Sequence, residues 1–152
     1  MKISIIGTGA MGSVYAGLLG DGGNEIWAID RWADHIEAIR QNGLRVEGIS
    51  GDRTVRINAT TDAAKVGVCA LVIIATKAMD VVQAAKSAKA LLDQDTTVLI
   101  IQNGLGSFEK VADILGGKRV IVGIAGGFGA SIKSPGRVHH NGMEFVHLGE
   151  LK

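Results

Sequence analysis

Three glycines near the amino terminus follow a short apolar run with the spacing G-x-G-x-x-G. The first glycine allows a tight turn, the second lets the backbone approach a ligand closely, and the third lets the following helix pack against the preceding strand. The amide groups of such a turn and the dipole of its helix attract a diphosphate. The alternative is that the glycines only connect a strand to a helix. The turn consists of Gly7, Thr8, Gly9, Ala10, Met11 and Gly12.

The segments on either side of this turn have the pattern of a βαβ unit. Lys2–Ile6 is an apolar run, apolar residues recur at helical spacing from Met11 to Leu19, and Glu25–Ile29 is a second apolar run. This order within about 30 residues is the fingerprint of a dinucleotide-binding domain. The sequence therefore predicts that the turn binds the diphosphate of a nicotinamide dinucleotide.

Two adjacent charged residues after the second apolar run point to opposite cofactor preferences. Asp30 lies 18 residues after Gly12, where a carboxylate can accept both ribose hydroxyls of NAD. Arg31 can pair with the 2′-phosphate of NADP and lie over the adenine. We favour NADP(H) over NAD(H). The alternative is a surface ion pair without a role in binding.

Two polar residues follow later apolar runs, where the strand ends of an α/β sheet form a ligand crevice. Lys77 follows the run that ends at Ala75, and Asn103 follows the run that ends at Ile101. Lys77 either points at a ribose or a substrate carboxylate, or it begins a helix in solvent. Asn103 either offers its amide to a carbonyl or the nicotinamide, or it forms a left-handed turn before Gly104.

The remaining chain alternates between strand and helix patterns, which predicts an α/β Rossmann fold, a single domain of residues 1–152 with a doubly wound, mostly parallel sheet. Further strands are expected at Leu71–Ala75, Thr97–Ile101 and Val120–Ile124, and helices at Trp32–Asn42, Asp80–Leu92 and Ser107–Leu115. Two antiparallel hairpins are also expected. One is inserted and joins Leu44–Ile49 to Thr54–Asn58, and the other is C-terminal and joins Arg137–His140 to Phe145–Leu148 about Asn141 and Gly142.

The composition excludes several classes of protein. The 152 residues include 16 Lys and Arg and 15 Asp and Glu, so there is no basic surface for a nucleic acid. The longest apolar stretch, from Val66 to Ala75, is about half of the ~20 residues that cross a membrane. The single cysteine, Cys69, suggests a reducing compartment, and we expect a cytoplasmic protein. His139 and His140 are adjacent on an expected strand and would face opposite ways, so no metal site is expected.

The chain resembles the N-terminal domain of the ketopantoate reductases, or 2-dehydropantoate 2-reductases, along its whole length. The asparagine-glycine motif together with the lysine is the most discriminating part of this resemblance. The matching segments are Lys2–Gly12, Arg31, Thr76-Lys77-Ala78, Gln102-Asn103-Gly104-Leu105-Gly106, Gly129-Ala130, Pro135-Gly136 and Leu148-Gly149-Glu150.

The resemblance implies an oxidoreductase and a role for each motif. Gly7–Gly12 would hold the diphosphate, Arg31 the adenosine phosphate, and Ala130 would make a backbone contact with the cofactor. Lys77 and Asn103 would contact the nicotinamide side and the substrate in supporting catalytic roles. The implied reaction passes a hydride from NADPH to the ketone of ketopantoate, a small 2-oxo acid, in pantothenate and coenzyme A biosynthesis.

The length of the chain departs from this family. Its helical C-terminal domain, which would supply the lysine that protonates the substrate oxygen, is absent from this chain. We therefore expect cofactor binding without turnover. The face that would meet that domain is expected to be apolar, and two such faces could pair as a homodimer.

Two alternatives remain open. One is a related NAD-dependent 2-oxo or 3-hydroxy acid dehydrogenase, which Asp30 would favour. The other is an NAD(H)-sensing regulatory module without chemistry of its own. Lys77 and Asn103 distinguish the sensor, because a sensor needs no side chains directed at the nicotinamide ring.

Overall fold

The computed structural model describes residues 1–103, 106–142 and 145–149. Within these residues the larger of two sheets has seven strands in the order β11-β8-β7-β6-β1-β2-β5. Neighbouring strands are parallel except β11, which is antiparallel to β8. The predicted doubly wound, mostly parallel sheet is confirmed. Its strands are β1 (Lys2–Ile6), β2 (Glu25–Ile29), β5 (Asn58–Thr60), β6 (Leu71–Ile74), β7 (Thr97–Ile100), β8 (Val120–Gly126) and β11 (Phe145–Gly149).

The smaller sheet has the strand order β4-β3-β10-β9 among the described residues. Strand β3 is antiparallel to β4, so the inserted hairpin forms, and it is parallel to β10, which arrives from much later in the chain. Strands β9 and β10 are antiparallel. The bounds are β3 (Leu44–Gly48), β4 (Arg53–Val55), β9 (Gly129–Ser134) and β10 (Arg137–Gly142).

The predicted C-terminal hairpin about Asn141 and Gly142 is wrong, because both residues lie within β10. The tight turn is instead at Pro135 and Gly136, and it joins β9 to β10. Proline fixes the first central position of such a turn, and Gly136 adopts the positive φ of 75° that the second position requires. Strand β11 then leaves the smaller sheet and pairs with β8.

The strand expected at Thr54–Asn58 is divided between the two sheets. Its first part is β4 in the smaller sheet, and Asn58 begins β5, which pairs in parallel with β2. Each part of the strand buries an apolar side chain in a different place. Val55 packs beside α1 (Ala10–Asp21) near Gly20, and Ala59 packs in the apolar core against the larger sheet.

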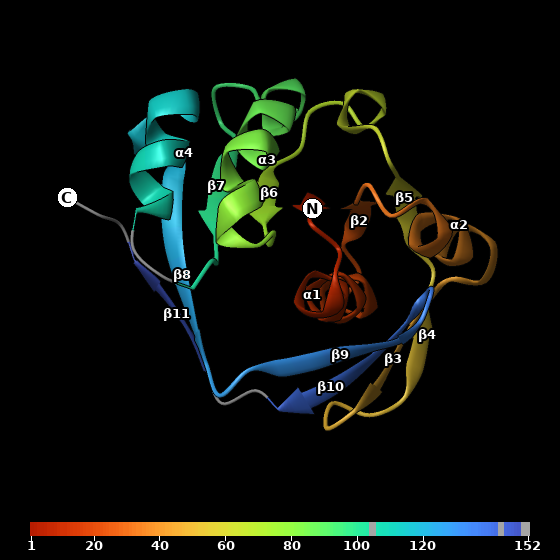
Figure 1. Ribbon diagram of the computed structural model, residues 1–152. Helices are drawn as coiled ribbons and strands as arrows, with labels where there is room; N and C mark the ends of the chain where they lie inside the picture. Colours follow the sequence, from red (N-terminus) through yellow and green to blue (C-terminus); the bar gives the residue numbers. More distant parts are fainter. Residues whose placement is uncertain (104–105, 143–144, 150–152) are drawn as a thin grey trace.

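The helices form layers on both faces of the larger sheet. Helices α3 and α4 lie on one face, whereas α1 lies between the larger sheet and the smaller one (Figure 1). The helix expected at Asp80–Leu92 is α3 with a short 3-10 turn at each end. The remaining bounds are α2 (Ala33–Asn42), α3 (Val81–Ala88), α4 (Ser107–Leu115), η1 (Ala63–Lys65), η2 (Ala78–Asp80), η3 (Lys89–Leu91) and η4 (Gly117–Arg119).

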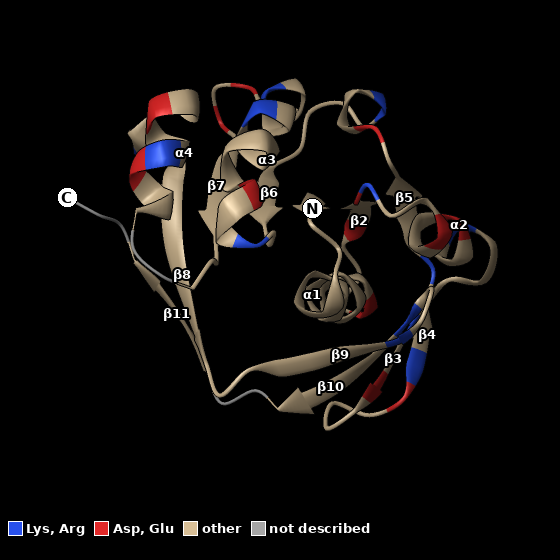
Figure 2. Ribbon diagram, in the orientation of Figure 1, with Lys and Arg blue, Asp and Glu red and all other residues tan. Residues whose placement is uncertain are grey.

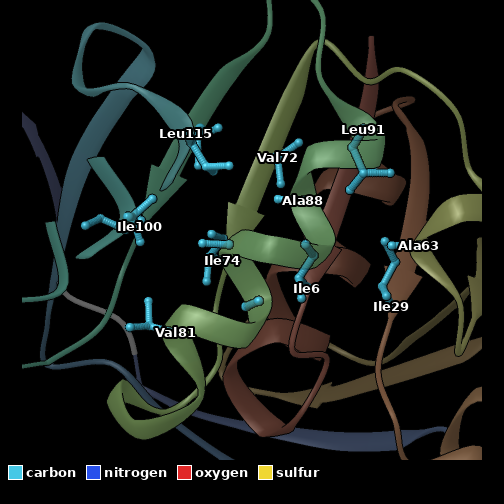
Figure 3. Close-up of a cluster of buried hydrophobic side chains, with 14 of the residues drawn as sticks. Ile6, Ile29, Ala63, Val72, Ile74, Val81, Ala88, Leu91, Ile100 and Leu115 are labelled. Carbon is cyan, nitrogen blue, oxygen red and sulfur yellow. The ribbon is translucent and has the colours of Figure 1, made fainter. Parts of the chain in front are cut away.

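Two apolar clusters fill the spaces between these layers. The cluster in Figure 3 packs α3 and α4 against strands β1, β6 and β7, with Val72, Ile74 and Leu91 fully buried. The second cluster packs α1 against both sheets. Strands β6 and β7 carry no charged residue, whereas charges gather on α4 and on strands β3 and β4 (Figure 2). The centre of the larger sheet is therefore a buried support without charged side chains on β6 and β7.

Candidate functional site

A cavity of about 750 Å³ lies at the carboxyl ends of strands β1, β2, β6 and β7. The strand order reverses between β6 and β1, and α/β proteins bind ligands at this kind of switch point. Most of the predicted site residues border it. Its lining consists of Ile6, Gly7, Gly9, Ala10, Met11, Ile29, Asp30, Arg31, Thr61, Ala63, Ala75, Thr76, Lys77, Ala78, Met79, Asp80, Gln83, Ala84, Ser87, Ile101, Gln102 and Asn103.

Two glycines of the loop are required by the packing of the chain itself. Gly7 has a φ of 91°, and a Cβ atom there would lie 2.7 Å from the backbone nitrogen of Thr76. A Cβ atom at Gly12 would collide with the carbonyl oxygen of Gly7. The tight-turn interpretation accounts for these two positions without a ligand.

Gly9 is different, because neither packing nor backbone geometry requires a glycine there. Its φ is −69°, and among the described residues a Cβ atom there would have no neighbour within 4 Å. Gly9 precedes α1 and lines the cavity together with Ala10 and Met11. The space that its missing side chain leaves is therefore open to a ligand at the amino end of α1, where backbone amides lack helical partners.

A buried hydrogen-bonded chain holds the loop from the side opposite the cavity. The Ser13 hydroxyl donates to the carbonyl of Thr8 at 2.9 Å and lies 3.0 Å from Nε2 of His35. The amide of Gly136 donates to Nδ1 of His35 at 2.9 Å. Nδ1 therefore accepts, and the neutral ring carries its proton on Nε2 and donates to Ser13. His35 is fully buried and supports the loop, a role that no local sequence pattern indicates.

The carboxylate of Asp30 is held by the backbone that follows it. It accepts a hydrogen bond from the amide of Trp32 at 2.9 Å at the border of the cavity. Arg31 reaches across the cavity to Asp80 at 3.4 Å, and its side chain is 85% exposed. The ion pair of Arg31 is thus formed with a residue that the sequence analysis did not single out.

Lys77 and Asn103 lie where the sequence predicts, after strands β6 and β7, and both are exposed at the cavity. Gln102 joins these strand ends, because its Nε2 donates to the carbonyls of Ile74 at 2.7 Å and Thr76 at 3.3 Å. Within the described residues, Oε1 of Gln102 and Oγ1 of Thr76 are buried without a hydrogen-bond partner. Gly104 and Leu105 of the predicted motif, and Glu150 of the last one, lie outside the described residues.

The structure does not bring every predicted residue to the cavity. Ala130 lies on β9, pairs with His140 and packs in the apolar cluster of the smaller sheet. Thr8 and Gly12 are fully buried behind the loop. None of these three borders the cavity, so the backbone contact expected at Ala130 stays a prediction.

The opposite wall of the cavity was missed from sequence. It includes Thr61 and Ala63 near η1, and Asp80, Gln83 and Ser87 near and on α3. The spacing of the last three is helical, so a polar stripe on the expected helix was the available signal. No cluster of three metal-ligating side chains occurs in the part of the chain that the structure describes.

None of the helices in the described ranges is long and apolar enough to span a membrane. The fold and the place of its cavity define the Rossmann class of α/β proteins. A family described as ketopantoate reductase PanE/ApbA matches residues 3–152, so the chain belongs to this family.

Individual relatives agree with this assignment. A 2-dehydropantoate 2-reductase from Pyrococcus horikoshii is 40% identical over 98% of this chain and 47% of its own length. One from Pyrococcus abyssi is 37% identical with the same coverage. The chain therefore spans about half the length of the curated relatives it matches.

Solved structures give the same result. The 2-dehydropantoate 2-reductase of Geobacter metallireducens has a TM-score of 0.92 and 33% identity over 99% of this chain and 49% of its own. D-mandelate dehydrogenase in a ternary structure with NADH and anilino(oxo)acetate has a TM-score of 0.91 and 30% identity over 100% of this chain and 49% of its own.

Proposed function

We propose that the cavity binds a nicotinamide dinucleotide and that the protein serves a 2-dehydropantoate 2-reductase reaction. The observation that carries the proposal is the open space at Gly9, because the chain keeps a glycine where its own packing does not need one.

Each group at the cavity has a role in this proposal. The loop from Gly7 to Gly12 offers backbone amides to the diphosphate, and Asp30 and Arg31 face the adenosine. Lys77 and Asn103 contact the nicotinamide side and the ketopantoate. When bound, the dinucleotide supplies a hydride to the ketone carbon of the substrate.

We propose NADP(H) as the favoured cofactor because Arg31 presents an exposed guanidinium at the adenosine end. Replacing Arg31 by Ala should weaken NADPH binding about tenfold, which corresponds to about 1.4 kcal/mol, and leave NADH binding within about twofold. Parallel calorimetric titrations of wild type and Arg31→Ala with NADPH and with NADH measure these affinities. An equal loss for both dinucleotides would show that Arg31 does not contact a 2′-phosphate.

The binding site itself is tested at Gly9. A methyl group there should block the approach of the diphosphate and weaken NADPH binding at least about tenfold, at a cost in stability of about 1 kcal/mol or less. Gly149→Ala is a matched control. Among the described residues a Cβ atom at Gly149 also has no neighbour within 4 Å, and Gly149 ends β11, which does not border the cavity. If Gly9→Ala binds as tightly as wild type, the proposed position of the diphosphate is wrong.

We further propose that residues 1–152 by themselves bind the cofactor without turning over substrate. The matched relatives are about twice as long as this stretch, and the ketopantoate-reductase resemblance assigns the proton-donating lysine to the C-terminal domain of the family, outside the matched half. Proton transfer contributes roughly two to four orders of magnitude to such a reaction. A ketopantoate-dependent oxidation of NADPH by this chain at the rate of a complete enzyme would refute the proposal.

A second candidate is reduction of another 2-oxo acid with NADH. The carboxylate of Asp30 favours it, and a 30% identical D-mandelate dehydrogenase was solved with NADH. Tighter binding of NADH than NADPH would favour this candidate. A sensor without chemistry is the third, and it alone predicts that Lys77→Ala and Asn103→Ala keep the full cofactor affinity.

A further inference from the structure

Asp80 lies across from the end of β2, on the other side of the cavity that we assign to the dinucleotide. It ends η2, immediately before α3, whereas Arg31 follows β2. Nη2 of Arg31 lies 3.4 Å from both carboxylate oxygens of Asp80. In the hydrogen bonds of the described residues, this carboxylate accepts from Arg31 alone. The two side chains therefore bridge the adenosine end of the cavity.

We propose that Asp80 is a specificity-determining residue that lowers the preference of the site for a phosphate on the 2′-oxygen of the adenosine ribose. This inference rests on the proposed dinucleotide site. A 2′-phosphate, with a charge between −1 and −2, must replace Asp80 as the partner of Arg31 and then remain beside the displaced carboxylate. A 2′-hydroxyl meets neither obstacle.

The other carboxylate at this end has a different role. Asp30 is already fixed by the amide of Trp32 at 2.9 Å, so its position does not depend on Arg31. Asp80 has no comparable anchor for its side chain and depends on the guanidinium. Asp80 therefore acts through the availability of Arg31, whereas Asp30 acts directly on the ribose.

The geometry of the pair sets the expected size of the effect. A contact of 3.4 Å is long for a charged hydrogen bond, which is ordinarily 2.7–2.9 Å, and the arginine side chain is 85% exposed. Exposed ion pairs of this kind are weak. Freeing Arg31 from Asp80 should therefore raise the affinity for a 2′-phosphate by up to about fivefold. Removal of the carboxylate charge beside the phosphate adds to this gain, so the combined effect is about five- to tenfold and not orders of magnitude.

The test compares wild type with Asp80→Asn, which removes the charge and keeps the shape. Calorimetric titrations use NADPH and NADH, together with 2′,5′-ADP and 5′-AMP as probes of the adenosine end alone. The variant should bind NADPH and 2′,5′-ADP about five- to tenfold more tightly and NADH and 5′-AMP within about twofold of wild type. Asp95→Asn is the control, because Asp95 is an exposed carboxylate before β7, at the opposite end of the strands.

The proposal predicts that the gain from Asp80→Asn falls to about twofold or less when Arg31 is replaced by Ala, because only the direct repulsion between the carboxylate and the phosphate is then relieved. Equal changes for NADPH and NADH, no change for either, or an undiminished gain in the Arg31→Ala background would each overturn the role of Asp80 and leave the dinucleotide site standing. If wild type binds neither dinucleotide, the proposed function fails, and this inference fails with it.

Discussion

The two sheets of this protein differ in what they contribute to the cavity. The larger sheet supplies strand ends that border it, and its central strands β6 and β7 are free of charge. The smaller sheet supplies none of the lining residues, and it carries ion pairs such as Arg137 with Glu47 at 2.8 Å. Bonding to Arg137 keeps the pKa of Glu47 low. Charged side chains are thus absent from β6 and β7, which support the site, and they occur in the smaller sheet, where no ligand is expected.

The smaller sheet nevertheless acts on the glycine loop from behind. Helix α1 packs between the two sheets so closely that a Cβ atom at Gly17 would collide with Val46 of β3. The bond between Gly136 and His35 connects the turn of the smaller sheet to Ser13 and Thr8. The larger sheet therefore shapes the cavity, and the smaller sheet fixes the backbone of the loop that borders it.

The largest expected effect comes from replacing a glycine of α1 that packs against the loop, compared with one that packs against the smaller sheet. Gly12→Ala should cost about 3 kcal/mol of unfolding free energy and abolish dinucleotide binding, because its Cβ atom meets backbone of the loop. Gly17→Ala should cost about 1 kcal/mol and keep binding, because the obstacle is a side chain and alanine regains helix propensity. Urea denaturation and NADPH titration measure both. Loss of binding in a folded Gly17→Ala protein would contradict the division of roles.

The histidine link is the next test. His35→Ala should cost about 2–3 kcal/mol, since it leaves the buried amide of Gly136 without an acceptor and removes the donor to the Ser13 oxygen, and it should weaken NADPH binding. His140→Ala is the control, because His140 is also buried but bonds to Ser50 in the turn between β3 and β4. It should lower stability and leave binding unchanged. Equal binding losses in both variants would mean that His35 has no special connection to the loop.

A smaller effect is expected from pH. Burial lowers the pKa of His35 and of His140, although Asp30 acts against the shift at His35 and His139 and Arg53 add to it at His140. The unfolded chain therefore binds more protons, and stability should fall as pH decreases below about 6.5, by at most about 1.4 kcal/mol per pH unit for each ring. Thermal unfolding between pH 8 and 5, roughly spanning that range, measures the slope. His35→Gln and His140→Gln should each flatten it, and an unchanged slope in both would refute the assignment.

The smallest effect on stability is expected at the outer edge of the larger sheet. Val146 and Leu148 of β11 lie on one face of the sheet and are 37% and 63% exposed. If this apolar edge pairs two chains, Val146→Lys with Leu148→Lys should convert dimers to monomers in sedimentation experiments, with less than about 1 kcal/mol of change in the unfolding free energy. A wild-type protein that stays monomeric at high concentration would contradict the homodimer.

The part of the fold that local patterns determine was predictable from sequence. The glycine loop, its flanking strands and the later alternation of strands and helices all depend on neighbouring residues. The pairing of β3 with β10, which completes the smaller sheet, was not predictable in the same way. It joins residues that are far apart in the sequence, such as Arg45 of β3 and Arg137 of β10. The Asn141-Gly142 pair illustrates the problem, since a local hairpin signal was overruled by pairing with β9.

The site residues likewise divide into those that local sequence patterns predict and those that depend on contacts between distant parts of the chain. Gly9, Asp30, Lys77 and Asn103 were found because each follows a strand that the sequence reveals. His35 was missed because its partner Gly136 is far away in the chain, and no spacing rule connects them. The importance of Asp80 likewise depends on the place of η2 across the cavity from Arg31, which only the three-dimensional structure shows.

The bond between Gly136 and His35 also bears on how the protein is made. Its two residues are 101 positions apart, so the glycine loop leaves the ribosome well before the turn that secures it. At ordinary rates of synthesis this interval is roughly 5–20 s. During that time the nascent chain holds its first βαβ unit without β10, and newly made protein should acquire a fixed loop only as the last strands dock.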